Sequence, residues 1–159
     1  MTNLAERGAL IMKLRALPDQ IRELVDGLSE AELLAHPEGE WTVAQNVHHL
    51  ADSHFNAFCR VKLALTENRP TIKPYDQDAW AALSDANHTA VSESLSILKG
   101  LHSRWARLLE SLTPEQWGRK FYHPENKVEV SVEEMLSSYV NHGEGHIRQI
   151  KEALATIGK

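Results

Sequence analysis

The stretch TVAQNVHHLADSHFNAFCRVKLALT, Thr42 to Thr66, decides the fold class of this chain. It opens with TVAQ, a capping box in which the side chains of Thr42 and Gln45 satisfy N–H groups at the start of a helix. Beyond it, apolar residues recur at intervals of three and four positions, which places them on one helical face. These residues are Val43, Val47, Leu50, Ala57, Phe58, Val61 and Leu65. The stretch therefore predicts one long amphipathic helix.

Three more segments share this helical spacing, at about 3–27, 90–112 and 131–157. Pro18 either kinks the first of them or restarts it after Leu17. The last begins with SVEE, another capping box, and should stop at Gly158. Four long helices predict an all-α fold, a four-helix bundle, over a single domain of residues 1–159.

Shorter elements are expected between the long helices. SEAE at Ser29 and TPEQ at Thr113 have capping-box form and predict single helical turns. Pro70 and Pro74 require an extended connection after the second long helix, and a short helix can follow from Tyr75. Residues 121–130 look extended, with a hairpin at HPENKVEV. The long connection after residue 66 is a candidate crossover.

Composition excludes several classes of function. The net charge is -5 and no basic cluster offsets it, so binding to nucleic acid or to an anionic membrane has no electrostatic support. No apolar run approaches the roughly 20 residues that span a bilayer, and the first residues lack the pattern of a signal peptide. Cys59, the one cysteine, excludes an internal disulfide and fits a reducing compartment. A cytoplasmic protein is expected.

The histidines are the candidate chemistry. On the second helix, His49 lies on a polar stripe with Gln45, Ser53, Asn56 and Arg60. His54 lies within the apolar face instead, so it is expected in the core. It is the reserve candidate for a metal ligand if His49 is not one. His142 and His146 are four residues apart, so they share one side of the last helix. Taken alone, such a pair is either exposed to solvent or lies at a packing boundary with its ring nitrogens hydrogen-bonded. A third imidazole from another helix would complete a three-histidine metal site.

Other residues near these positions have two interpretations each. Asp52 could orient a ligand imidazole or be solvated, and Asn56 and Arg60 could hold a polar or anionic substrate group, although a surface salt bridge suits Arg60 equally. Tyr139 could reach the pocket, but its phase on the helix is also that of a packing residue. Gly143 and Gly145 weaken a helix interior by about 1 kcal/mol each. Ligand access or a closely packed neighbouring helix would account for them.

The segments GEWTVAQNVHHLADSHFNAFCRVKLALTENRPTIKPYDQDAW, LHSRW, FYHPE and NHGEGHIRQI resemble the YfiT-like branch of the DinB superfamily. The resemblance extends from about Leu17 to Ile150. It implies a four-helix bundle that binds a divalent metal, zinc first and nickel as the alternative. It places the metal ligands at the histidine before LAD, which is His49, and at the two histidines of the late motif, His142 and His146. Some such proteins are homodimers, so a homodimer is expected.

Three functions follow from this resemblance and from the chemistry of the site. The first is a metal-dependent hydrolase, because zinc lowers the pKa of a water that it binds to about 7. The second is a thiol S-transferase that joins a low-molecular-weight thiol, such as bacillithiol, to an electrophile. The third is a non-catalytic, metal-binding bundle, which would have a closed site with four protein ligands. The first two imply a small-molecule substrate, and the sequence assigns no general base to either of them.

Overall fold

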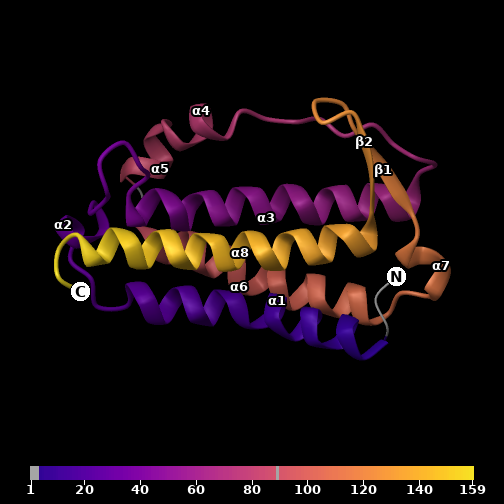
Figure 1. Ribbon diagram of the computed structural model, residues 1–159, viewed down its shortest axis with the longest axis horizontal. Helices are drawn as coiled ribbons and strands as arrows, with labels where there is room; N and C mark the ends of the chain where they lie inside the picture. The colour runs from indigo at the N-terminus through magenta and orange to yellow at the C-terminus, as the bar shows by residue number, and fades with distance from the viewer. Residues whose placement is uncertain (1–3, 89) are drawn as a thin grey trace.

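The computed structural model of the protein describes residues 4–88 and 90–159, and within them four long helices form a bundle. Each begins and ends within a few residues of the bounds expected from its caps and spacing. The four are α1 (Leu4–Val25), α3 (Val43–Thr66), α6 (Val91–Glu110) and α8 (Val132–Ala155). The predicted four-helix fold is confirmed (Figure 1). None of the described helices is long and apolar enough to cross a membrane.

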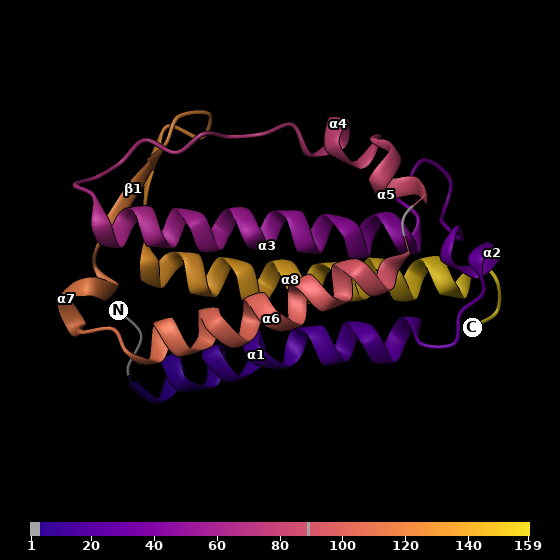
Figure 2. The ribbon, with the colours of Figure 1, turned by 180° about the vertical axis from the view of Figure 1, so that it is seen from behind.

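Each long helix packs against two others. α1 and α3 both contact α6 and α8, so the order around the bundle is α1, α6, α3, α8. Figures 1 and 2 show α1 and α8 running in one direction and α3 and α6 in the other. Because α3 and α6 are parallel, the chain between them must return along the whole bundle. The expected crossover is therefore present, and the structure describes it over residues 67–88.

The short elements lie at the ends of the bundle and along the crossover. They are α2 (Glu30–Leu33), α4 (Gln77–Ala81), α5 (Ser84–His88), α7 (Pro114–Trp117) and the antiparallel strands β1 (Lys120–His123) and β2 (Val128–Ser131). The predicted capping boxes form at Ser29, Thr42, Thr113 and Ser131. The crossover is joined to β1 by hydrogen bonds in which Ile72 N donates to Tyr122 O and Tyr122 N donates to Pro70 O.

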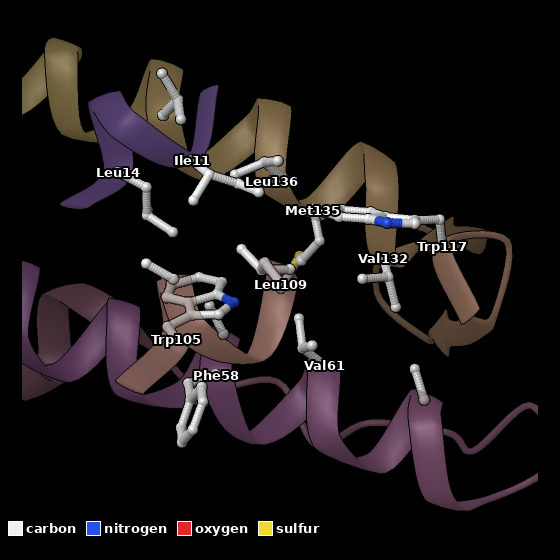
Figure 3. Packing of buried hydrophobic residues seen from close by; sticks show 14 of the residues in the cluster. Ile11, Leu14, Phe58, Val61, Trp105, Leu109, Trp117, Val132, Met135 and Leu136 are labelled. Carbon is white, nitrogen blue, oxygen red and sulfur yellow. The ribbon is translucent and has the colours of Figure 1, made fainter. Parts of the chain in front are cut away.

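A layer of histidines divides the apolar core. One buried cluster contains Trp105, which lies beside Phe58, and extends toward α7 and the β-strands (Figure 3). The other contains Leu50 and Leu98 and extends toward α2. Along every long helix the change from one cluster to the other falls at the same level, which is where His54 and His102 lie with exposed fractions of 0%.

α1 is one continuous helix in which Pro18 is buried, so the proline neither ends it nor restarts it. The ring of a proline removes the N–H that would bond the carbonyl four residues earlier, here that of Leu14. Close by, Gly143 of α8 faces α1. A Cβ atom built on Gly143 would lie 2.6 Å from Cδ2 of Leu17. Close packing of a neighbouring helix, one of the two reasons considered for this glycine, therefore accounts for it.

Gly145 provides a matched control for Gly143. A Cβ atom there would meet only the tip of the Arg148 side chain, at 3.8 Å. We expect Gly143→Ala to lower the free energy of unfolding by about 1 kcal/mol, because an overpacking cost of about 1–3 kcal/mol exceeds the gain in helix propensity. Gly145→Ala should raise it by up to about 1 kcal/mol. Urea unfolding of the two variants checks this, and equal effects of the same sign would contradict it.

Candidate metal centre

Three imidazoles from two antiparallel helices meet in the bundle. His49 of α3 and His142 and His146 of α8 each offer a ring nitrogen, and these atoms lie within 4.8 Å of one another. Nε2 of His142 is central, 3.3 Å from Nε2 of His49 and 3.1 Å from Nε2 of His146. The structure thus brings together the three residues that were predicted as ligands. That they bind a metal remains a prediction.

The middle of the polar stripe of α3 faces the interior of the protein, and its ends are half-buried. His49 is only 5% exposed and Ser53 only 4%. α8 covers one side of the stripe, and the Trp41 ring packs against His49 with centroids 4.7 Å apart. One turn before His49, Gln45 Nε2 donates hydrogen bonds to Ala81 O and to Asn87 Oδ1 of the crossover. Buried polar groups require partners, and the crossover and Tyr139 of α8 supply them to Gln45 and Ser53.

Asn46 fixes the orientation of one imidazole. Its Nδ2 donates to Thr42 O at 2.9 Å, so the amide oxygen is the atom that faces His146. An amide oxygen only accepts, and Nδ1 of His146 lies 2.7 Å from it. Nδ1 therefore carries the proton, and the lone pair of a neutral His146 is on Nε2, toward the other two rings. A partner of this kind is usual behind a metal-binding histidine.

Burial keeps these rings neutral. It lowers the pKa of His49 and of His142 to about 4, and the neighbouring His142 contributes to the shift at His49. Burial also lowers the pKa of His146 to about 3, assisted by the two neighbouring imidazoles. At neutral pH all three rings consequently keep lone pairs that can bind a cation without first losing a proton.

The three residues fit a divalent metal. With Zn–N bonds of about 2.0–2.1 Å, a tetrahedral ion holds neighbouring ligand nitrogens about 3.3 Å apart. The two distances from His142 Nε2, 3.3 and 3.1 Å, are close to this spacing. Three neutral imidazoles suit zinc, nickel, copper or iron, and geometry alone does not choose among these metals.

A pocket of about 520 Å³ opens beside His142. Its wall includes Ser53, Arg60, Tyr75, His123 and Tyr139. Burial raises the pKa of the Tyr75 hydroxyl, which therefore stays protonated at neutral pH. Burial lowers the pKa of His123, and the nearby Arg60 guanidinium lowers it further. The pocket thus combines neutral donors and acceptors with one permanent cation, Arg60, and with the two carboxyl groups of Asp76 and Glu125.

The other predicted residues divide into two groups. Arg60 and Tyr139 line the pocket with His142, and the Tyr139 ring also packs 5.3 Å from the His142 ring, so pocket and packing roles coincide there. Asp52 and Asn56 are not among the pocket-lining residues, and Asn56 Nδ2 donates to the Asp52 carbonyl within the helix. Burial, together with Asp85, raises the pKa of the Asp52 carboxyl.

Sequence reasoning missed Asn46, Trp41 and Tyr75. Asn46 had a detectable signal, since it lies one turn before His49 and can reach the same face of the helix. Tyr75 had none, because its position depends on the path of the crossover. His123 takes part in both a turn and the pocket. Asn126 N donates to its Nδ1 at 3.4 Å and the residue also lines the pocket, so both placements are observed.

The model of the DinB superfamily matches residues 13–150 of this sequence. The chain belongs to the DinB superfamily. Among DinB relatives, "Putative metal-dependent hydrolase YfiT" of Bacillus subtilis is 42% identical over 154 residues, covering 96% of this chain and 86% of the relative. A "Putative metal-dependent hydrolase" of Geobacillus thermodenitrificans is 43% identical over 88% of this chain and 79% of its own length.

Two solved structures share the fold seen here. Bacillus subtilis YfiT, described as a probable metal-dependent hydrolase with an unusual four-helix bundle topology, has a TM-score of 0.96 and 40% identity, covering 99% of this chain and 91% of that one. A mycothiol-dependent maleylpyruvate isomerase has a TM-score of 0.71 with 15% identity, covering 94% of this chain and 63% of that one. At that identity the second likeness concerns the fold alone.

Proposed function

We propose that this protein is a metal-dependent hydrolase whose metal is held by His49, His142 and His146. The observation that carries the proposal is the convergence of three neutral imidazoles, two buried and one half-buried, beside a polar pocket. The names of relatives about 42% identical, which describe metal-dependent hydrolases, support the same reaction class. Zinc is the proposed ion, with nickel as the alternative.

The number of ligands favours catalysis over a structural role. The cluster contains three possible protein ligands among the described residues, whereas structural zinc sites are closed by four. An ion held by three ligands keeps a position open, and it would supply Lewis-acid chemistry by lowering the pKa of a water or thiol toward neutrality. His142 belongs both to the cluster and to the pocket wall, so a molecule in the pocket would lie next to the ion.

Arg60 favours a small substrate with an anionic or strongly polar group, placed at its guanidinium and away from the carboxyl groups of Asp76 and Glu125 that also line the pocket. Within the described part of the chain, Nε of Arg60 is buried without a hydrogen-bond partner, although Nη2 donates to Lys73 O at 3.4 Å. A buried, unpaired donor on a cation is costly, and an anionic substrate group would satisfy it. Tyr75 would then donate its hydroxyl proton to a second polar atom. The chain's own residues thus bind and orient the substrate beside the ion.

Metal analysis combined with a panel of ester, amide and phosphoester substrates tests this function. We expect one ion per chain and hydrolysis that is lost with a chelator and restored by zinc or nickel. Arg60→Met should raise KM for an anionic substrate by about 10-fold or more, because a charge-assisted hydrogen bond is lost. KM for a neutral analogue of that substrate should not change. Lys62→Met, an exposed cation on the same helix, is the control. The proposal would be refuted if the purified protein contained no metal and also bound none when zinc or nickel was added.

A second pocket favours thiol transfer as the alternative function. It measures about 390 Å³, includes His142 and His146, and reaches Trp41 and Asp78 instead of Arg60. Two pockets at one metal centre provide room for two molecules, as transfer of a thiol to an electrophile requires. In that reaction the S–H proton is released, a C–S bond forms, and the leaving group departs with its electron pair. Metal-dependent loss of free thiol, without hydrolysis of any substrate in the panel, would decide for the transferase.

A further inference from the structure

A chain of buried histidines leads away from the metal centre. Nδ1 of His142 lies 3.2 Å from Nε2 of His54, and Nδ1 of His54 lies 3.0 Å from Nε2 of His102. Nδ1 of His102 lies 2.5 Å from the Leu14 carbonyl oxygen. The series thus crosses the bundle from α8 through α3 and α6 to α1.

The far end of the series sets the direction of every hydrogen bond in it. A carbonyl oxygen only accepts, so Nδ1 of His102 carries the proton. In a neutral ring Nε2 is then an acceptor, which requires the proton of His54 on Nδ1, and the same reasoning places the proton of His142 on Nδ1. His54 and His102 are 0% exposed, and burial lowers the pKa of both, so the neutral state holds at pH 7.

Pro18 explains why the Leu14 carbonyl is available. This carbonyl lies four residues before the proline in α1, so it lacks its ordinary in-helix donor. A buried carbonyl without a partner is unfavourable, and the His102 ring supplies the missing hydrogen bond. A proline inside a long helix, which disrupts the helical ladder, is thereby matched to a histidine on another helix.

We propose that His54 and His102 are positioning residues for His142. They hold it in the Nδ1–H tautomer, with its Nε2 lone pair at the metal position. The Leu14 carbonyl, which Pro18 leaves without an in-helix donor, anchors the series. Asn46 holds His146 in the same tautomer. Two lone pairs then face each other across 3.1 Å, an arrangement that a shared metal cation relieves. The metal-binding part of this inference rests on the proposed function, whereas the tautomers are a property of the metal-free protein.

Nitrogen-15 NMR of the metal-free protein, labelled in histidine, tests the tautomers directly. The two ring nitrogens have distinct shifts according to which carries the proton, and single histidine variants assign them. We expect His54, His102 and His142 all to carry the proton on Nδ1. A proton on Nε2 of any of the three would overturn the proposal. This result stands whether or not the protein binds metal, so it is separable from a failure of the hydrolase assignment.

Zinc affinity, measured by chelator competition, tests the positioning role. His54→Leu should weaken zinc binding by about 10–100-fold and His102→Leu by about 10-fold, as loss of a partner behind a metal ligand does. His102→Gln should restore most of the affinity, because its amide oxygen can accept from His54 in place of Nε2. Unchanged affinity in a folded His54→Leu protein would overturn the role.

His48→Leu is the matched control for the cost of altering a buried histidine. His48 lies on the same helix as His54, is 5% exposed, and its Nδ1 lies 2.8 Å from Ser94 Oγ. We expect this variant to bind zinc as the unaltered protein does. If it loses as much affinity as His54→Leu, the effect is general and the proposal fails. If His54→Leu does not fold, the tautomers of the unaltered protein decide.

Discussion

Replacing His142 with alanine is expected to abolish stoichiometric binding of a divalent metal. Nε2 of His142 lies within 3.3 Å of both other candidate ligand atoms, so its loss leaves two imidazoles without the central one. Zinc sites bind with about 10–16 kcal/mol, and removal of one of three protein ligands should cost at least about 3 kcal/mol, which is more than 100-fold in affinity. Elemental analysis after dialysis, followed by competition with a chelator, measures the change.

The same loss is expected for His49→Ala and His146→Ala, because the site draws on both helices. His36→Ala is the control, since His36 is exposed and its Nδ1 contacts the adjacent Pro37 carbonyl. A full complement of metal in dialysed His142→Ala protein would refute the assignment of the ligands. If His49→Ala were the one variant to retain its metal, the site would keep the two histidines of α8, and His54 would be indicated as the third ligand.

Acid is expected to unfold the metal-free protein well above the pH at which ordinary carboxylates titrate. Burial lowers the pKa of His49, His102 and His142 to about 4, below the ordinary value of 6.5. The unfolded chain therefore binds more protons between these values, and stability falls as the pH falls. The contribution of these rings is complete above pH 6.5 and is lost progressively from there to about pH 4.

The size of this effect should be large. Between pH 7 and 5 one such ring removes about 2 kcal/mol, and three remove about 6 kcal/mol, comparable with a typical total stability of about 5–15 kcal/mol. Thermal melts of chelator-treated protein at pH 7, 6 and 5 measure the loss, with the exposed-site variant His36→Gln as the control. Melting temperatures that agree within about 2 °C across this range would contradict the prediction.

Much of the fold could be predicted because its signals are local. A capping box depends on two side chains three residues apart, and four of them marked helix starts correctly, at Ser29, Thr42, Thr113 and Ser131. The short helix α5 was missed because five residues carry no periodicity. Pro18 was ambiguous, since whether a helix continues through proline depends on whether another group satisfies the freed carbonyl.

The site was harder to predict because burial is set by neighbouring elements. The stripe containing His49 resembles a solvated face, and only the packing of α8 and the crossover makes it internal. His54 was expected in the core, and it is there, but the helical wheel gives no indication that its ring connects His142 to His102. Contacts between residues about 90 positions apart depend on the topology of the bundle and leave no trace in the spacing of either helix.

The histidine layer also bears on how order is transmitted along the bundle. Buried apolar side chains form one cluster on each side of it, and at its own level the side chains between the helices include hydrogen-bonded imidazole rings. Cooperative melting of the two halves therefore depends on a few directional contacts that a cation would reinforce. In amide hydrogen exchange, the ends of the bundle should open as a single unit with metal bound and as two separate units after its removal.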